Sequence, residues 1–141
     1  MTYLVDTNVW SELRIRGRCD ANVRAWAESV PETAFYLSVV TVMELERGVL
    51  RIERRDATQG AMLRIWLENH VLLPFAERTL PVTVAIARQG AALHVPDPRP
   101  QSDALIAATA LVHGLTVVTR NTSDFVPMGV QLMNPWLAAT P

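Results

Sequence analysis

The chain contains one cysteine, Cys19, and no lysine. A single cysteine cannot form an internal disulfide, so the composition favours a protein of the reducing cytoplasm. No run of about 18 uninterrupted apolar residues occurs, which argues against a transmembrane helix. The N-terminus has no basic start and carries an acid directly after its first apolar run, so we expect it to form a strand and not a signal peptide.

Histidine is also scarce, and the residues His70, His94 and His113 lack the spacing of zinc ligands. We expect them at the surface or at helix ends. The net charge of −1 argues against a protein that coats nucleic acid through bulk positive charge. All thirteen basic residues are arginine, the better bidentate ligand for phosphate. A GC-rich genome is nevertheless the simpler explanation for the missing lysines.

The length of 141 residues, half of them hydrophobic, predicts one domain over residues 1–141 with a substantial core. Strand-like patterns occur at residues 3–5, 34–39, 115–119 and 130–133, with a proline-interrupted candidate at 79–83. Helical patterns follow Thr7 and occupy residues 20–30, 41–55, 58–73, 84–94 and 101–113. This alternation predicts an α/β fold with a mostly parallel sheet of about five strands, covered on both faces.

Residues 95–100 contain three prolines and cannot be helical, so they should form a stiff loop before the helix at 101–113. Gly114 directly follows that helix and is expected to end it in the left-handed conformation. The chain shows no internal repeat, low-complexity segment or domain linker.

Four carboxylates stand where apolar elements begin or end. Asp6 ends the first strand, Glu44 begins a helical pattern, Asp103 opens an alanine-rich helix and Asp124 follows a late strand. In parallel sheets, ligands bind beyond the carboxyl ends of the strands, so we expect these acids to converge there. Closely packed anions require a cation or protons to neutralise them. The pattern therefore predicts a site for a hard divalent cation, the usual agent for cutting phosphodiesters.

Each acid also has a purely structural interpretation, which the sequence leaves open. Asp6 could cap a following helix, and Glu44 could form a capping box with Thr41. Asp103 is favoured at a helix N-terminus by capping and by the helix dipole. Asp124 could be a turn residue. None of these positions is specific alone, and it is their joint placement that favours a site.

Three segments carry a family likeness: YLVDTNVWSEL at residues 3–13, SVVTVMELERG at 38–48, and SDALIAATALVHGLTVVTRNTSDF at 102–125. With the late apolar tail, they resemble the PIN-domain family, and within it the VapC-type toxin ribonucleases of the FitB-like subgroup. The likeness spans nearly the whole chain, in the right order and spacing. The third segment is the most specific, since an acid opens an alanine-rich helix and a strand then ends in Thr-Arg-Asn-x-x-Asp-Phe.

The resemblance implies a three-layer α/β/α sandwich and a Mg²⁺- or Mn²⁺-dependent endoribonuclease that uses a metal-activated water in an acidic groove. By position, Asp6 and Asp103 would hold the metal most directly, and Glu44 and Asp124 would act partly through water. The residues implied to support these acids or to position the substrate are Thr7, Asn8, Thr119 and Asn121. Asn121 departs from the family pattern, in which many members carry aspartate.

The resemblance further implies an RNA substrate, a homodimer, and a small antitoxin that carries a DNA-binding half and blocks the acidic groove. This chain itself contains no DNA-reading motif. An alternative is a catalytically weak PIN-like protein that acts only through partner contacts. A phosphatase with a nucleophilic aspartate fits poorly, because that class needs a second acid two residues after the first and Asn8 stands there.

A set of arginines on the segment after Glu44 has two interpretations. Arg47, Arg51 and either Arg54 or Arg55 recur at three- and four-residue steps, so they share a helix face. They could contact an RNA backbone or an acidic partner. They could equally form a solvated face, with ion partners drawn from Glu46, Glu53 and Asp56. The four tryptophans are expected in the core or at an interface, with Trp66 on an apolar helix face.

Overall fold

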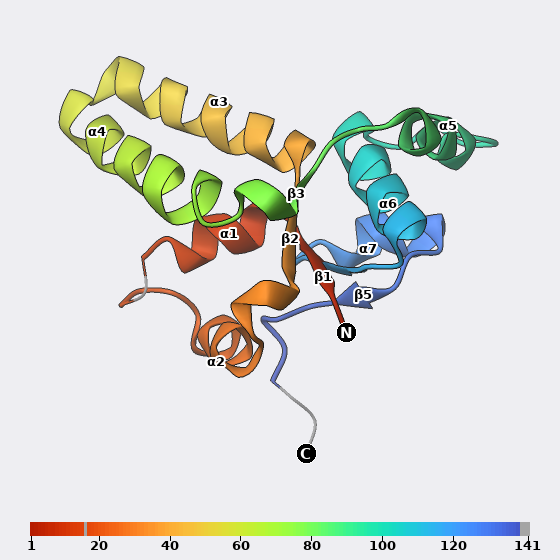
Figure 1. The fold of residues 1–141 in the computed structure, drawn as a ribbon, viewed down its shortest axis with the longest axis horizontal. Helices are drawn as coiled ribbons and strands as arrows, with labels where there is room; N and C mark the ends of the chain where they lie inside the picture. The colour runs from red at the N-terminus through yellow and green to blue at the C-terminus, as the bar shows by residue number, and fades with distance from the viewer. Residues whose placement is uncertain (16, 139–141) are drawn as a thin grey trace.

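The computed structural model describes residues 1–15 and 17–138. Within these residues a parallel sheet has the strand order β3-β2-β1-β4-β5 (Figure 1). The strands are β1 (Tyr3–Val5), β2 (Phe35–Ser38), β3 (Thr79–Leu80), β4 (Thr116–Val118) and β5 (Leu132–Met133). The predicted α/β fold with a parallel sheet of about five strands is therefore confirmed.

The described α-helices are α1 (Thr7–Leu13), α2 (Ala21–Ser29), α3 (Val39–Arg55), α4 (Ala57–Trp66), α5 (Val84–Leu93), α6 (Gln101–His113) and α7 (Thr122–Phe125). The shorter helical segments are η1 (Glu32–Ala34), η2 (Leu67–Leu72), η3 (Ala76–Arg78) and η4 (Val126–Met128). None of the helices described is long and apolar enough to cross a membrane.

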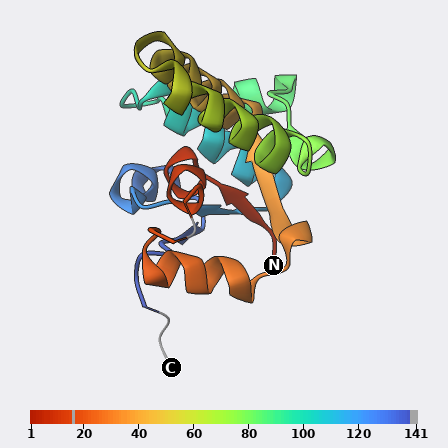
Figure 2. The same ribbon diagram turned by 90° about the vertical axis from the view of Figure 1, so that its left-hand side faces the viewer.

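The sheet is covered on both faces because successive strand residues point in opposite directions. Val5 and Val118 pack with residues of α1, α2, α3 and η2 in one buried cluster. Their neighbours Leu4 and Val117 pack with α6 and α7 in the other. Figure 2 shows α2 and α6 on opposite sides of the strands. The result is the predicted three-layer α/β/α sandwich.

The start of α3 corrects one sequence interpretation. The helix predicted at residues 41–55 begins two residues earlier, because Ser38 Oγ caps it by accepting from the Val40 amide at 3.0 Å. The capping box of Thr41 and Glu44 is wrong. Thr41 is buried and its hydroxyl has no hydrogen-bond partner among the described residues, while Glu44 accepts from Thr7 instead.

Other boundaries differ for local reasons. The helix predicted at 58–73 is α4 followed by the π-helical segment η2. The strand candidate at 79–83 shortens to β3, because Pro81 has no amide to donate to a neighbouring strand. Gly114 ends α6 with φ 68°, as expected, and its N–H donates to the Ala110 carbonyl.

Helices α3 and α4 lie side by side and antiparallel (Figure 1), and polar contacts join them. Arg64 of α4 pairs with Glu46 of α3 at 2.6 Å and with Glu53 at 3.0 Å. Asp56 caps α4 by accepting from the Gln59 amide at 3.0 Å. The three acids expected as ion partners for the arginine face are therefore engaged with α4, and none of them forms an ion pair with those arginines among the described residues.

Gly60 permits this close approach. A Cβ built on Gly60 would lie 2.5 Å from the Glu53 Cα, whereas a Cβ built on Gly48 of α3 would meet no atom within 4 Å. We expect Gly60→Ala to lower the free energy of unfolding by about 1–3 kcal/mol, because two backbones must separate. The matched change Gly48→Ala should raise it by about 0.5–1 kcal/mol through helix propensity. Urea unfolding of both variants measures the difference, and equal effects would contradict this packing.

Candidate active site

The candidate site lies at the carboxyl edge of the three central strands. β1 runs between β2 and β4, all in parallel. Asp6 follows β1 directly, and its amide donates to the Val118 carbonyl at 2.9 Å. Thr119 follows β4 at the same level, and α3 starts where β2 ends. The sheet register therefore brings side chains from distant parts of the chain to one edge.

Asp6 is 6% exposed and is held by hydrogen bonds to both carboxylate oxygens. Its Oδ1 accepts from the Thr7 amide at 2.8 Å, and its Oδ2 accepts from the Thr119 hydroxyl at 2.8 Å. Asp6 is thus the N-cap of α1, as its structural interpretation expected. The same side chain also faces the residues after β4, so capping and membership of a site coexist.

Asn8 and Thr119 tie α1 to the loop after β4. Asn8 Nδ2 donates to Thr119 Oγ1 at 3.2 Å, and Asn8 Oδ1 accepts from the Arg120 amide at 3.2 Å. The Asn121 amide also donates to Thr119 Oγ1, at 3.1 Å. Because Thr119 is fully buried, these contacts fix the hydroxyl that serves Asp6. Asn121 takes part through its backbone.

Glu44 reaches the same edge from α3. Its Oε1 accepts from the Thr7 hydroxyl at 2.8 Å, a contact across 37 positions of sequence. Thr7 therefore links two acids, with its amide bound to Asp6 and its hydroxyl bound to Glu44. Burial raises the pKa of Asp6, the hydrogen bonds from Thr119 and Thr7 oppose that rise, and the charge of Glu44 adds to it.

Asp103 completes the cluster from the first turn of α6. It does not cap the helix, because Pro100 is the N-cap residue. Burial, followed by the charges of Asp6, Asp124 and Glu44, raises the pKa of Asp103 to about 6. Asp124 lies in the first turn of α7 and not in a plain turn. The four predicted acids are therefore close enough to act on one another electrostatically.

The cluster is not a preformed metal cage. Among residues 1–15 and 17–138, no three His, Cys, Asp or Glu side chains are arranged to hold a metal ion as they stand. The charges nevertheless converge on Asp103, and the oxygens of Asp6 and Glu44 are engaged by the hydroxyl and amide groups described above. The charged groups of the site that could ligate a metal are thus all carboxylates, and their oxygens repel one another.

One contact of the residue after Thr119 was not anticipated from sequence. Arg120 follows Thr119 directly, and its guanidinium lies 5.1 Å from the centre of the Trp136 ring. Such contacts hold an arginine without neutralising it. Trp136 is half-buried, and its carbonyl accepts from Asn22 Nδ2 at 2.8 Å. The only sequence signal was the position of Arg120, one residue beyond a predicted site residue.

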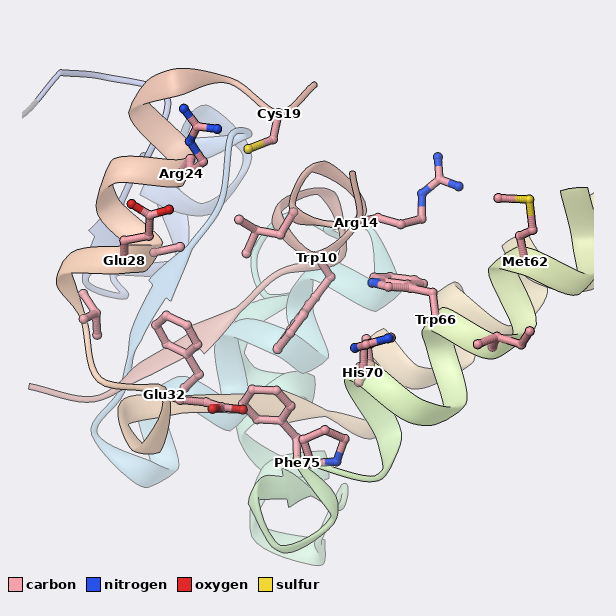
Figure 3. A pocket seen from close by; sticks show the side chains of 17 residues that line it. Trp10, Arg14, Cys19, Arg24, Glu28, Glu32, Met62, Trp66, His70 and Phe75 are labelled. Carbon is pink, nitrogen blue, oxygen red and sulfur yellow. The ribbon is translucent and has the colours of Figure 1, made fainter. Parts of the chain in front are cut away.

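A pocket lies away from the acids. A pocket of about 840 Å³ is bounded by α1, α2 and α4, and none of the four acids lines it. Figure 3 shows Trp66 and His70 on one wall, Trp10 on the floor, and Arg24 and Glu28 on the facing helix. Trp66 packs against the core as expected, while Met62 is 69% exposed. The lining combines aromatic and aliphatic side chains with charges of both signs, and such a mixture suits the side chains of a protein partner better than phosphates.

The comparisons with known proteins agree with the family likeness. A family model described as the PIN domain matches residues 3–126. The VapC ribonuclease Y4jK of Sinorhizobium fredii is 36% identical over 141 residues, covering 94% of this chain and 96% of that protein. Toxin FitB of Neisseria gonorrhoeae is 37% identical over 139 residues, covering 94% of this chain and 97% of that protein. The structure of FitAB bound to an IR36 DNA fragment matches with a TM-score of 0.89 at 33% identity, covering 99% of each chain.

The raised pKa of Asp103 predicts how stability depends on pH without metal. The folded state holds the Asp103 proton more tightly than the unfolded state, since the pKa is about 6 against an ordinary 3.8. This contribution is complete below about pH 4 and is lost as the pH rises through about 6.

Asp103→Asn removes the repelled charge. In EDTA we expect this variant to match the original protein near pH 4 and to be more stable at pH 7.5. The difference should be about 1–2 kcal/mol, after allowance for solvent screening of a half-buried group. Urea unfolding across this range measures it. Asp97→Asn, in the exposed loop, is the control, and an equal gain there would contradict the assignment to the acid cluster.

Proposed function

Since the chain belongs to the PIN-domain family, we propose that it is a Mg²⁺- or Mn²⁺-dependent endoribonuclease and the toxin of a toxin–antitoxin pair. The observation that carries the proposal is the convergence of Asp6, Glu44, Asp103 and Asp124 at one sheet edge. Two relatives that match nearly the whole chain are named as a VapC ribonuclease and as toxin FitB, which supports the proposal.

The donor set fits a hard divalent cation. Mg²⁺ prefers oxygen ligands, keeps several waters, and is commonly held by one or two carboxylates together with a substrate phosphate. A cage of three protein ligands is therefore not required. We assign Asp6 and Asp103 as the direct ligands, with Glu44 and Asp124 acting through water. A bound ion would supply polarisation of a phosphate oxygen and a coordinated water of lowered pKa.

The chain's own residues prepare this site. Thr119 and Thr7 each donate to one oxygen of Asp6, which fixes the plane of its carboxylate. Thr7 also holds Glu44, so the two acids keep a constant separation. Asn8 anchors the backbone after β4 and thereby the buried hydroxyl of Thr119. No nucleophilic side chain is needed, because water is the attacking group.

We propose a small antitoxin with a DNA-binding half as the partner, as in the FitAB complex bound to DNA. The pocket between α1, α2 and α4 supports this proposal, because its aromatic walls suit an amphipathic helix laid into a groove. Exposed apolar side chains elsewhere, such as Met43 at 55% and Val84 at 78%, support a homodimer.

The first test is cleavage of a mixed single-stranded RNA by antitoxin-free protein. We expect cutting with Mg²⁺ or Mn²⁺ and none in EDTA. Asp6→Ala and Asp103→Asn should each lower the cleavage rate by more than about 100-fold. This exceeds the effect of removing a residue that only supports a metal ligand. Asp97→Asn should cut normally. Cutting that persists in EDTA or in both folded variants would refute the assignment, and failure of every form to bind Mg²⁺ in calorimetry would favour a binding-only protein.

Thr119 provides a test of positioning. Thr119→Val keeps the shape of the side chain but removes the hydroxyl that donates to Asp6, so we expect a loss of about 10–100-fold in activity or metal affinity. Thr119→Ser retains the hydroxyl and should keep most of the activity and metal affinity. A titration of activity against Mg²⁺ concentration separates a loss of metal affinity from a loss of maximal activity. Equal curves for all three proteins would exclude a positioning role.

A further inference from the structure

One face of α3 continues directly from the acid cluster. With 3.6 residues per turn, Arg51 and Arg55 lie within about 20° of Glu44 around the helix axis, and Arg47 lies within about 60°. Glu44 is held in the site by Thr7, and the helix runs from there away from the sheet (Figure 1). At 1.5 Å per residue, Arg55 stands roughly 16 Å along the helix from Glu44.

The arginines on this face have no acidic partners among residues 1–15 and 17–138. All three are exposed, and none forms an ion pair with another residue in the part of the chain that the structure describes. The acids nearest in sequence are occupied, since Glu46 and Glu53 pair with Arg64 across the helix pair. Three positive charges in a row that begins at Glu44 therefore remain available to bind an anionic ligand.

Gly48 lies on the same face, about 40° from Glu44. It is exposed in the middle of a 17-residue helix, and a Cβ there would meet no atom within 4 Å. A glycine at such a position costs about 0.5–1 kcal/mol relative to alanine. Gly60 is explained by the packing of α3 on α4, but no contact among the described residues requires Gly48. Its missing side chain leaves a gap in the helix surface between Glu44 and Arg51.

On the premise of the ribonuclease function above, we propose that Arg47, Gly48, Arg51 and Arg55 form a track that binds the phosphate backbone of single-stranded RNA. The four acids repel phosphates, so cations beside them are needed to hold a long substrate. Guanidinium groups bind phosphate oxygens in a bidentate manner. The steps of four residues between these arginines correspond to a rise of about 6 Å, which suits contacts to several phosphates of one strand.

The track contributes affinity for long RNA and leaves the chemistry to the acid cluster. The discriminating variant is the double change Arg51→Gln and Arg55→Gln, and the matched control is Arg18→Gln, an exposed arginine between α1 and α2. The substrates are a fluorescent single-stranded RNA of about 20 nucleotides and a short oligonucleotide of about four, each cut in Mg²⁺ over a range of salt concentrations.

We expect the double variant to raise KM for the long RNA about tenfold while kcat and cleavage of the short RNA stay unchanged. Its binding should also depend less on salt, with the slope of log Kd against log salt falling by about 1.4 for two lost phosphate contacts on a single strand. Gly48→Ala should weaken binding of the long RNA although it stabilises the helix. Arg51→Lys with Arg55→Lys should restore the salt slope in part.

Two outcomes are distinct failures. If the original protein cuts neither RNA, the proposed ribonuclease function fails. If it cuts both, and the double variant shows the same KM and salt slope, the RNA track is overturned and the arginines are left to an acidic protein partner. A loss shared by Arg18→Gln would also overturn it, since bulk charge would then explain the effect.

Discussion

Repulsion among like charges is the constraint on which this structure depends. Four carboxylates share one edge of the sheet, and burial, followed by the charges of the other three acids, raises the pKa of Asp103 to about 6. A fold under no other demand would separate such groups. The hydroxyl and amide donors around Asp6 and Glu44 offset part of the repulsion, and they do so from residues directly next to the acids or across the sheet.

The sandwich makes this convergence sterically feasible. Helix α6 buries Ala104, Ala107, Ala108 and Ala110. These small side chains let its axis lie close to the sheet, so Asp103 in its first turn reaches the same edge as Asp6. On the other face, Val5 and Val118 anchor β1 and β4 in the core directly before Asp6 and Thr119. Buried, fully packed residues therefore directly precede the site residues Asp6 and Thr119.

Helix α3 has three separate surfaces. Leu45 and Val49 enter the core, Glu46 and Glu53 bind Arg64 of α4, and the remaining face carries Glu44 with the exposed arginines. The pairing with Arg64 has a consequence for the third surface, because it removes the acids that would otherwise neutralise the arginines. Packing of one helix pair thus determines the charge available beside the site.

The sequence determined the strands, most helices and the four acids placed next to apolar runs, because those signals are local: alternation, proline, glycine and the order of elements along the chain. The resemblance in three segments added the family, and the family model over residues 3–126 confirms it. Local reasoning was wrong where a distant partner competed. Thr41 and Glu44 match a capping box, yet Ser38 caps the helix and Thr7, 37 positions away, takes Glu44. Only the tertiary structure decided which donor each acid receives and which arginines stay unpaired, because hydrogen bonds and ion pairs depend on distance in space, which chain order does not specify.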